Sequence, residues 1–267
     1  GLVRAFFSSS YAFAVELLKL PKDIEIGREM IESVDAWQKN ESNIYDNIYD
    51  YLSDPDLYAG RAVNIIDFID QNTDLGKILV FANHPATFAY YKKIFEKIFN
   101  EQCVFFSANM ESDERELSVY KFQNENKCRI LLSDESGGEG RNFQHAEALI
   151  HIDIPWNANV LEQRIGRLDR VGREEDLPVL SVVAYAQGTV EESLFNVWND
   201  GLRIFQKSQS GLEIIMNEID SNIVDSVCSD FRYGLQAMVP HFVEKIDDLE
   251  KVVKKERYYD LAGYQYQ

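Results

Sequence analysis

Residues 77–82 read KILVFA, in which residues 78–82 form a short and continuously apolar run. Such a run is typical of a strand that is buried on both faces of a parallel sheet. Further apolar runs follow along the chain, with helical patterns between them. The predicted strands are 77–82, 103–106, 128–133, 148–152 and 179–185, and the predicted helices between them are 85–99, 113–123 and 157–170. Strands that alternate with helices at this spacing indicate an α/β fold, in which helices cover both faces of a parallel sheet.

Helical patterns flank this core on both sides. Upstream, residues 2–71 carry apolar positions at helical spacing (24–37, 44–52 and 57–69 among them), and Ser8–Ser10 is placed to cap the first helix. Downstream of Thr189, helical patterns continue through 212–227 and 234–257. The expected domains are an N-terminal helical segment (1–76), an α/β lobe (77–186) and a C-terminal helical extension (187–267).

The amino-acid composition limits the classes of protein to which the chain can belong. The chain has 267 residues, of which 45% are hydrophobic, and this content supports a sizeable core and excludes a disordered polymer. No apolar run approaches the roughly 18 to 20 residues of a membrane span. Three widely spaced cysteines exclude a disulfide framework and a thiolate zinc site, and they fit a cytoplasmic location. Because the sequence starts with Gly-Leu-Val-Arg, we expect a piece of a longer chain.

The charge balance restricts how a phosphate group can be bound. Lysine and arginine total 27 against 45 aspartates and glutamates, which gives a net charge of −18. So acidic a chain repels nucleic acid over most of its surface. Binding of a phosphate group therefore requires a local basic cluster.

One candidate loop follows the predicted strand 128–133 and reads DESGGEGRNF over residues 134–143. Its three glycines, within four positions, allow a close approach of the backbone to a ligand. Ligands of such sheets bind at the carboxyl ends of the strands, where this loop is expected. A plain tight turn fits the same composition, so the glycines alone do not distinguish a site from a connection.

The basic cluster lies further along, where residues 163–173 read QRIGRLDRVGR. Arg164, Arg167 and Arg170 recur at every third position, which predicts neighbouring places on one helical face. Guanidinium groups suit phosphate oxygens because each donates two parallel hydrogen bonds and keeps its charge. A solvated basic face, neutralised by nearby carboxylates, fits the same pattern. The residues by themselves leave both interpretations open.

These stretches resemble the motifs of a known superfamily. Residues 163–173 resemble motif VI of the second RecA-like lobe of superfamily-two helicases and translocases, and residues 134–144 look like its motif V. Residues 77–87 are similar to the strand that opens that lobe. Gln163 and the Asp-Ile-Pro-Trp-Asn stretch at 153–157 favour the Swi/Snf-type branch, in particular bacterial RNA-polymerase-associated ATPases and related translocases of phage-defence systems. The resemblance is strong over residues 77–200.

The resemblance implies a role for each matching position. Arg167 and Arg170 align with arginine fingers, which stabilise the charge that develops during transfer of the γ-phosphoryl group of ATP. Arg164 either shares this cleft or pairs with a carboxylate inside the lobe. The implied nucleotide-binding residues are Gln163, Gly138, Gly140 and Asn142, and the implied nucleic-acid-binding residues are Ser136 and Arg141.

The resemblance also implies ATP and Mg²⁺ as cofactors. No Gly-x-x-x-x-Gly-Lys-Ser/Thr loop occurs in the sequence, so we expect an N-terminal RecA-like lobe to bind both, and we expect this chain to be inactive alone. Asp134-Glu135 looks like a DEAD-box acidic pair but stands in the motif V loop. We interpret it as a coincidence, and the four histidines show no spacing for a metal.

The leading hypothesis is therefore the C-terminal motor lobe of an ATP-dependent DNA translocase. Its implied partners are the N-terminal lobe, nucleic acid in the form of duplex DNA, and RNA polymerase. Two alternatives remain open. One is a non-catalytic interaction module that docks a partner through its helical flanks, and the other is the lobe of a strand-separating DNA or RNA helicase.

Overall fold

The computed structural model describes residues 60–138, 143, 145–168, 179–206 and 233–264, with scattered positions in 5–19 and 222–230. The chain divides into two compact units. The first comprises Gly1–Pro155 and Gln163–Tyr185, and the second comprises Trp156–Glu162 and Ala186–Gln267.

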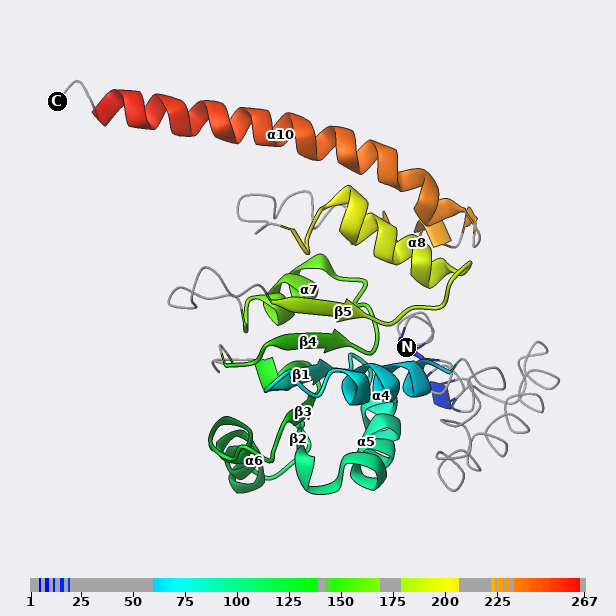
Figure 1. Cartoon of the computed structure of the whole chain (residues 1–267). Coiled ribbons are helices and arrows are strands. Elements are labelled where there is room, and N and C mark those ends of the chain that lie inside the picture. Colours follow the sequence, from blue (N-terminus) through cyan, green and yellow to red (C-terminus); the bar gives the residue numbers. More distant parts are fainter. Residues whose placement is uncertain are drawn as a thin grey trace. The chain divides into compact units, whose positions relative to one another are not determined.

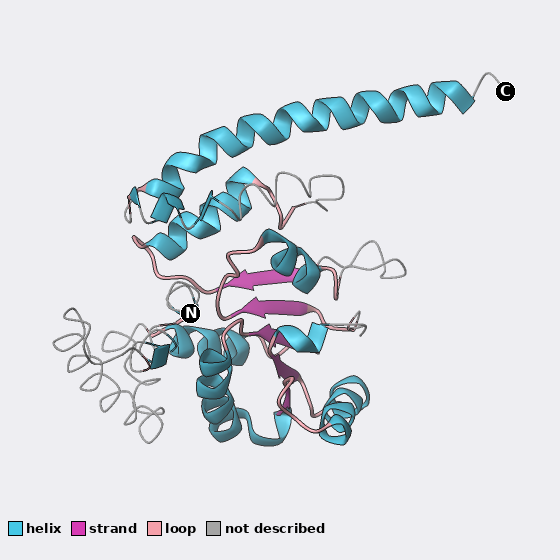
Figure 2. Cartoon of the chain, turned by 180° about the vertical axis from the view of Figure 1, so that it is seen from behind, coloured by secondary structure: helices cyan, strands magenta, loops and turns pink. Residues whose placement is uncertain are grey.

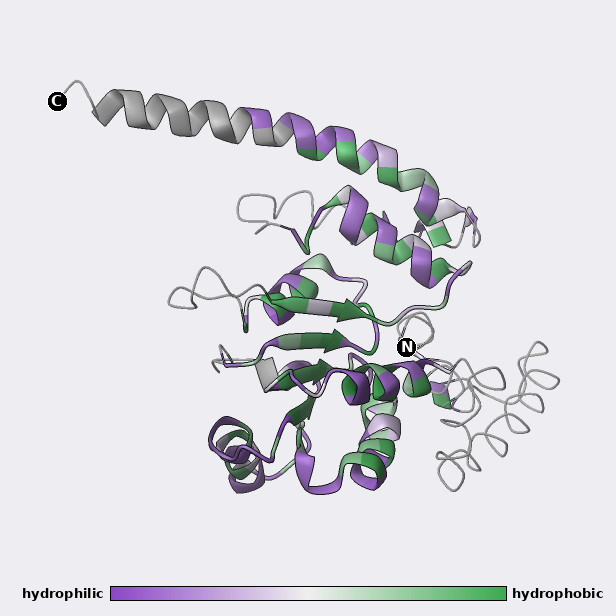
Figure 3. Cartoon of the chain, in the orientation of Figure 1, coloured by the Kyte–Doolittle hydropathy of each residue, from purple (hydrophilic) through white to green (hydrophobic). Residues whose placement is uncertain are grey.

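A parallel sheet of five strands forms the centre of the first unit (Figure 1). The strands are β1 (Ile78–Phe81), β2 (Cys103–Phe106), β3 (Ile130–Ser133), β4 (Ala148–His151) and β5 (Leu180–Val183), in the spatial order β2-β3-β1-β4-β5. In the central strand, Val80 lies opposite Leu132 of β3 and Ile150 of β4. Strands β1, β3 and β4 are buried along their whole length, which fits their largely apolar sequences (Figure 3).

Helices cover both faces of this sheet (Figures 1 and 2). They are α4 (Arg61–Gln71), α5 (Pro85–Phe99) and α6 (Ser112–Asn124). Helices α4 and α5 share one apolar cluster with Val80, whereas α6 shares a second cluster with Leu79. Successive strand residues point to opposite faces, so neighbours in β1 supply two separate cores.

The start of α5 shows how local chemistry sets an element boundary. His84 occupies the N-cap, and its Nδ1 accepts a hydrogen bond from the Ala86 N–H at 3.1 Å. Pro85 follows in the first turn, where its missing N–H and fixed φ are tolerated. Helix α5 therefore starts at the residue that the sequence predicts. A second predicted cap is also confirmed, because the Ser9 Oγ accepts from the Ala12 N–H at 3.0 Å.

The second unit is helical in its described part. It contains α8 (Val190–Asn196), a π-helical turn η3 (Val197–Gly201) and α10 (Gly234–Tyr264). Trp198 of η3 is fully buried, as are Phe242 and Ile246 of α10, and the three elements contact one another. Thr189 caps α8 by accepting a hydrogen bond from the Glu191 N–H. None of the described helices combines the length and the apolar character that crossing a membrane would require.

The α/β fold with helical segments outside the sheet is confirmed, and one predicted element needs correction. The sequence predicts a helix over 157–170, but α7 (Ala158–Ile165) ends at Ile165. A turn follows at Gly166, the residue type that loses most conformational freedom in a helix. Arg164 and Arg167 therefore do not share one continuous helical face.

The remaining sequence expectations are not decided by the described residues. The predicted helices 24–37 and 44–52, and most of 212–227, lie outside them. The predicted domain boundaries at residues 76 and 186 stay predictions.

The double burial of β1 leads to a stability prediction. Leu79→Ala removes a side chain that is 0% exposed in the central strand and should lower the free energy of unfolding by about 2–5 kcal/mol. The matched change Leu180→Ala, at a position that is 43% exposed in β5, should cost less than about 1 kcal/mol. Urea unfolding followed by circular dichroism measures both. Equal losses would contradict the assignment of β1 to the centre of the sheet.

Candidate functional site

The candidate site lies where the strands of the first unit end. Asn83 follows β1, Asp134 follows β3 and Asp153 follows β4. A 3₁₀ turn, η2 (Glu135–Gly138), opens the glycine-containing loop directly after β3. Because the strands are parallel, their carboxyl ends meet at one edge of the sheet, which is where such folds bind ligands.

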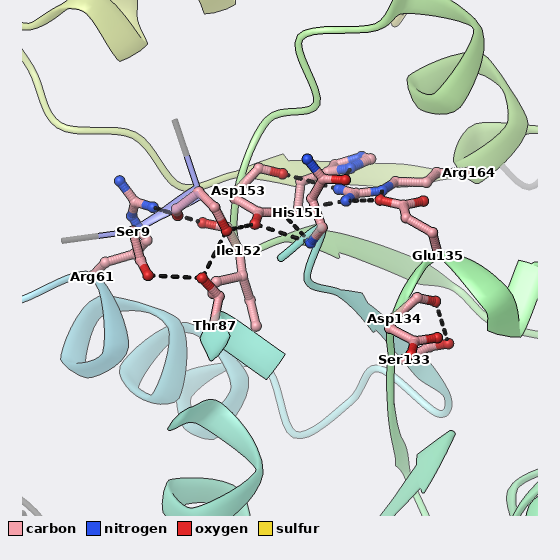
Figure 4. Close-up of polar contacts among 12 residues, drawn as sticks. Ser9, Arg61, Thr87, Ser133, Asp134, Glu135, His151, Ile152, Asp153 and Arg164 are labelled. Atoms are coloured by element: carbon pink, nitrogen blue, oxygen red, sulfur yellow. Dashed lines mark hydrogen bonds and ion pairs between the residues drawn. The ribbon is translucent and has the colours of Figure 1, made fainter. Parts of the chain in front are cut away.

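Arg164, in the last turn of α7, is the centre of a buried polar network at this edge (Figure 4). Its side chain is 1% exposed. Its Nε donates to the Glu135 Oε1 at 3.0 Å, and its Nη2 forms ion pairs with Glu135 and, at 3.3 Å, with the Asp153 Oδ1. Its Nη1 donates to the Asp153 carbonyl at 2.9 Å, and the guanidinium lies 5.2 Å from the centroid of the Phe81 ring. These partners compensate for the removal of a full charge from water.

The network keeps Arg164 charged. Burial by itself disfavours the charged form, but Glu135 and then Asp153 outweigh burial and raise the pKa of the guanidinium above its ordinary value. The sequence leaves Arg164 either in a ligand cleft or paired with a carboxylate inside the lobe. The structure confirms the second possibility.

His151 contributes to the network as a neutral group. Its Nδ1 lies 3.3 Å from the Arg164 Nη1, and its Nε2 lies 3.1 Å from the Ser181 Oγ. A guanidinium can only donate, so Nδ1 accepts and the proton of the ring is on Nε2. Burial, followed by the charge of Arg164, lowers the pKa of His151 well below its ordinary value.

Asp153 joins distant parts of the chain to this network. Its two carboxylate oxygens accept from the Asn83 N–H at 2.7 and 2.9 Å, and it also accepts from the Ser8 hydroxyl. Ser8 is fixed in turn, because its Oγ lies 2.7 Å from the Thr87 Oγ1 and its carbonyl accepts from the Arg61 Nη1 at 2.7 Å. The N-terminal segment is thus attached at the carboxyl ends of β1 and β4.

The acidic pair Asp134-Glu135 has protein partners on both members. Asp134 accepts from the Ser107 hydroxyl at 2.7 Å, from the Ala108 N–H at 3.0 Å, and from the N–H and hydroxyl of Ser136. It thereby fastens the loops after β2 and β3 to each other, whereas Glu135 pairs with Arg164. Within the part of the chain that the structure describes, no group of three or more His, Cys, Asp or Glu side chains is placed to hold a metal ion.

Arg167 lies in the turn after α7 and is bound to the glycine-containing loop through its backbone. Its N–H donates to the Arg164 carbonyl at 3.2 Å, and its carbonyl accepts from the Phe143 N–H at 3.3 Å. Phe143 and Leu168 are buried in the same apolar cluster as Phe122, and the Phe122 and Phe143 rings meet edge to face at 5.9 Å. The side chain of Arg167 is partly exposed.

The described part of the site thus holds some of the residues that the resemblance implies. Gln163 is exposed on α7, and η2 contains Ser136 and Gly138. The Ser136 N–H and hydroxyl donate to Asp134 in this arrangement. Gly140, Arg141, Asn142 and Arg170 lie outside the described residues. The roles of all these residues stay predictions.

The donor chemistry at this edge fits a triphosphate. The guanidinium of Arg167 and the exposed side-chain amide of Gln163 both donate hydrogen bonds of the kind that phosphate oxygens accept. Arg164 is not available for this purpose, because carboxylates occupy its donors. The donors of Arg167 and Gln163 thus fit a nucleotide, and their binding of one stays a prediction.

Comparison with known proteins identifies the class. Residues 61–172 match the helicase conserved C-terminal domain family. This match and the relatives described next support a second RecA-like lobe of a superfamily-two ATPase of the Swi/Snf type.

Two curated relatives show the extent of the similarity. The chain is 31% identical over 164 residues to the RNA polymerase-associated protein RapA of Vibrio vulnificus strain YJ016, which covers 61% of this chain and 17% of the relative. It is 31% identical over 209 residues to RapA of Proteus mirabilis strain HI4320, which covers 77% of this chain and 20% of the relative. The chain thus spans about a fifth of the length of these relatives.

Among solved structures, the chain is similar to the Sulfolobus solfataricus SWI2/SNF2 ATPase core in complex with dsDNA. The two are 22% identical, with a TM-score of 0.49, and the match covers 74% of this chain and 42% of that chain.

The network leads to a prediction about Arg164. Arg164→Met leaves two carboxylates at the edge of the sheet without their cation, so it should lower the free energy of unfolding by about 3–5 kcal/mol. The matched change Arg203→Met removes a partly exposed ion pair with Asp247 and should cost less than about 1 kcal/mol. Urea denaturation measures both variants. A cost at position 164 no greater than at position 203 would show that the buried pairs are not formed.

The neutral state of His151 leads to a pH prediction. Its native pKa lies below the ordinary value of 6.5, so the unfolded chain takes up this proton first. The stability that His151 contributes is present above pH 6.5 and is lost as the pH falls below 6.5, by up to about 1.4 kcal/mol per pH unit. His151→Gln keeps an acceptor for Arg164 and a donor for Ser181, and it should flatten the stability profile between pH 6.5 and 5.5. The control His145→Gln changes an exposed position and should keep the wild-type slope of stability against pH. If both variants showed the same slope, a neutral buried His151 would be excluded.

Proposed function

We propose that this chain is the C-terminal motor lobe of an ATP-dependent DNA translocase, and that Arg167 and Arg170 act as its arginine fingers. One observation carries the proposal: the two described arginines of the motif VI stretch have different environments. Arg164 is buried and paired with carboxylates, whereas the next arginine, Arg167, is partly exposed and is bound to the glycine-containing loop. A permanently charged, bidentate donor in that place suits the oxygens of a phosphoryl group.

The other residues of this edge complete the proposed site. Gln163 lines the nucleotide cleft, together with Gly138, Gly140 and Asn142 of the loop. Ser136 and Arg141 contact the nucleic-acid backbone. This assignment rests on the superfamily to which the lobe belongs and on the position of η2 at the carboxyl ends of the strands.

The chemistry follows from this arrangement. ATP with Mg²⁺, when bound mainly by an N-terminal RecA-like lobe, supplies the phosphoryl group that is transferred to water. Arg167 and Arg170 donate to the oxygens on which negative charge develops, and they act most strongly when closure of the lobes excludes water from the cleft. Because the fingers and the phosphate-binding loop belong to different lobes, hydrolysis is linked to the opening and closing that moves the motor along its track.

The partners are proposed on separate grounds. The Swi/Snf-type character of the lobe favours duplex DNA, and the net charge of −18 restricts contact with DNA to a local surface. The names of the RapA relatives state an association with RNA polymerase, and we extend that partner and a cytoplasmic location to this protein as part of the proposal.

The decisive experiment joins this chain to the lobe that carries the phosphate-binding loop and measures ATP turnover with duplex DNA, single-stranded DNA and RNA. Stimulation by duplex DNA alone supports the translocase. Stimulation by single strands or RNA favours a strand-separating helicase, and no turnover under any condition favours a non-catalytic interaction module. The chain by itself should not hydrolyse ATP, and Arg167-dependent turnover by the isolated chain would contradict the proposal.

A finger at position 167 has a kinetic signature. In the joined protein, Arg167→Ala should lower the DNA-stimulated kcat by about 10³-fold or more, because an arginine finger contributes roughly 10³ to 10⁵ in rate. The KM for ATP should change far less, because the interaction forms mainly in the transition state. Arg203→Ala, at a partly exposed arginine of the second unit, should leave both constants unchanged. A loss confined to KM would assign Arg167 to ground-state binding.

A further inference from the structure

Two serines of the N-terminal segment are joined to the sheet by a chain of hydroxyl groups (Figure 4). The Ser9 Oγ lies 2.7 Å from the Thr87 Oγ1, and the Ser8 Oγ lies 2.7 Å from the same atom. Ser8 also donates to the carboxylate of Asp153. Ser8 and Asp153 are each 1% exposed and Thr87 is 0% exposed, so three of the four members of this hydroxyl chain are withdrawn from water.

The hydrogen bonds of the hydroxyl chain have a single direction. Each hydroxyl has one proton, and a carboxylate can only accept. Because the Ser8 proton is used on Asp153, Thr87 donates to Ser8, and Ser9 donates to Thr87. The Ser9 Oγ in turn accepts from the Ala12 N–H at 3.0 Å. Every bond thus points toward the charge of Asp153, and bonds in such a series polarise and strengthen one another.

The side of the hydroxyl chain that belongs to the sheet is satisfied without the serines. Asp153 accepts from the Asn83 N–H at 2.7 and 2.9 Å and pairs with Arg164 at 3.3 Å. Helix α5, which carries Thr87, starts at its own N-cap, His84. Loss of the serines therefore leaves the charges of Asp153 and Arg164 paired, and it does not remove the cap of α5.

The N-terminal segment, by contrast, depends on these bonds. Its buried residues among those described are Ala5, Ser8 and Ala12, whose small side chains bury little apolar surface. Ser9 is a non-helical position between the helical positions Ser8 and Ala12. Short helical stretches are marginal in water, so this segment needs its attachment to stay ordered. The hydrogen bonds of Ser8 and Ser9 supply a large share of that attachment.

We propose that the hydroxyl chain of Ser9, Thr87, Ser8 and Asp153 is a latch, which fastens the N-terminal segment to the carboxyl ends of β1 and β4 and opens without disturbing the sheet. The latch sets whether the segment covers Thr87 and Asp153. Asp153 stays bound to Asn83 in both states. This inference goes beyond the proposed function and does not depend on it, so its test needs no ATP.

Two substitutions of Thr87 separate the hydroxyl from the shape of the side chain. Thr87→Val keeps the shape and removes the central hydroxyl, whereas Thr87→Ser keeps the hydroxyl. In Thr87→Val, amide hydrogen exchange measured by NMR should rise at least tenfold at Ser9 and Ala12, whose N–H groups bond within the segment to the Ala5 carbonyl and the Ser9 Oγ. In Thr87→Ser, exchange at both positions should stay within threefold of wild type.

The controls report on the sheet and on the kind of substitution. Exchange at Asn83 and at Val80 in β1 should stay within twofold of wild type in Thr87→Val, because the bonds of these residues do not involve the hydroxyl chain. Thr189→Val removes the hydroxyl that caps α8 and should leave exchange at Ser9 and Ala12 unchanged.

A second variant guards against a local packing defect at position 87. Ser8→Ala removes the last link to Asp153 and should raise exchange at Ser9 and Ala12 as Thr87→Val does. Exchange at Val80 shows in both variants whether the sheet is retained.

Three outcomes would overturn the latch. Wild-type exchange at Ser9 and Ala12 in Thr87→Val shows that other contacts hold the segment. Equal increases in Thr87→Val and Thr87→Ser assign the effect to lost packing. A rise at Asn83 or Val80 in both Thr87→Val and Ser8→Ala shows that the hydroxyl chain is part of the core and does not open by itself. ATP turnover enters none of these measurements, so the proposed function is decided separately.

Discussion

One buried cation governs how this lobe is organised at the edge of the sheet where the parallel strands end. The guanidinium of Arg164 is almost completely removed from water, and it stays charged because Glu135 and Asp153 lie against it. Neutral His151 accepts from it, and the Phe81 ring faces it. These partners come from β1, β4 and the turn after β3, so a single charge fixes the relative positions of three strand ends and of α7.

The same constraint gives equally spaced arginines different chemistry. The side chain of Arg164 is buried against the carboxylates of Glu135 and Asp153. Helix α7 ends one residue later, before Gly166. Arg167 therefore leaves the helical repeat and meets the loop after β3 through its backbone. Removing one guanidinium into the lobe also reduces the repulsion between neighbouring cations that a continuous helical face would impose.

The parts of the fold that the sequence predicts are those in which local pattern and tertiary environment agree. Strands β1, β3 and β4 read as apolar runs because both of their faces are buried, and α5 starts where His84 and Pro85 place it. The predicted end of the helix at residue 170 is wrong. The arginines at every third position favour a continuous helix, but α7 ends at Ile165, just before Gly166. The partners of Arg164 are 29 and 11 positions away in the chain, and no periodicity links such residues. His151 stands inside an apolar run, which signals burial but not its partner.

The acidity of the chain agrees with the proposal that its arginines act together with a phosphate-binding element of another lobe. With a net charge of −18, the long-range field of the protein opposes any polyanion, so attraction at the edge of the sheet is confined to short distances. Arg164 adds little to it, because two carboxylates balance its charge. In its proposed role, Arg167 therefore acts on a phosphoryl group that the other lobe has already bound. The proposed division of labour between two lobes thus assigns this lobe the supply of charge to a transition state rather than affinity for a ground state.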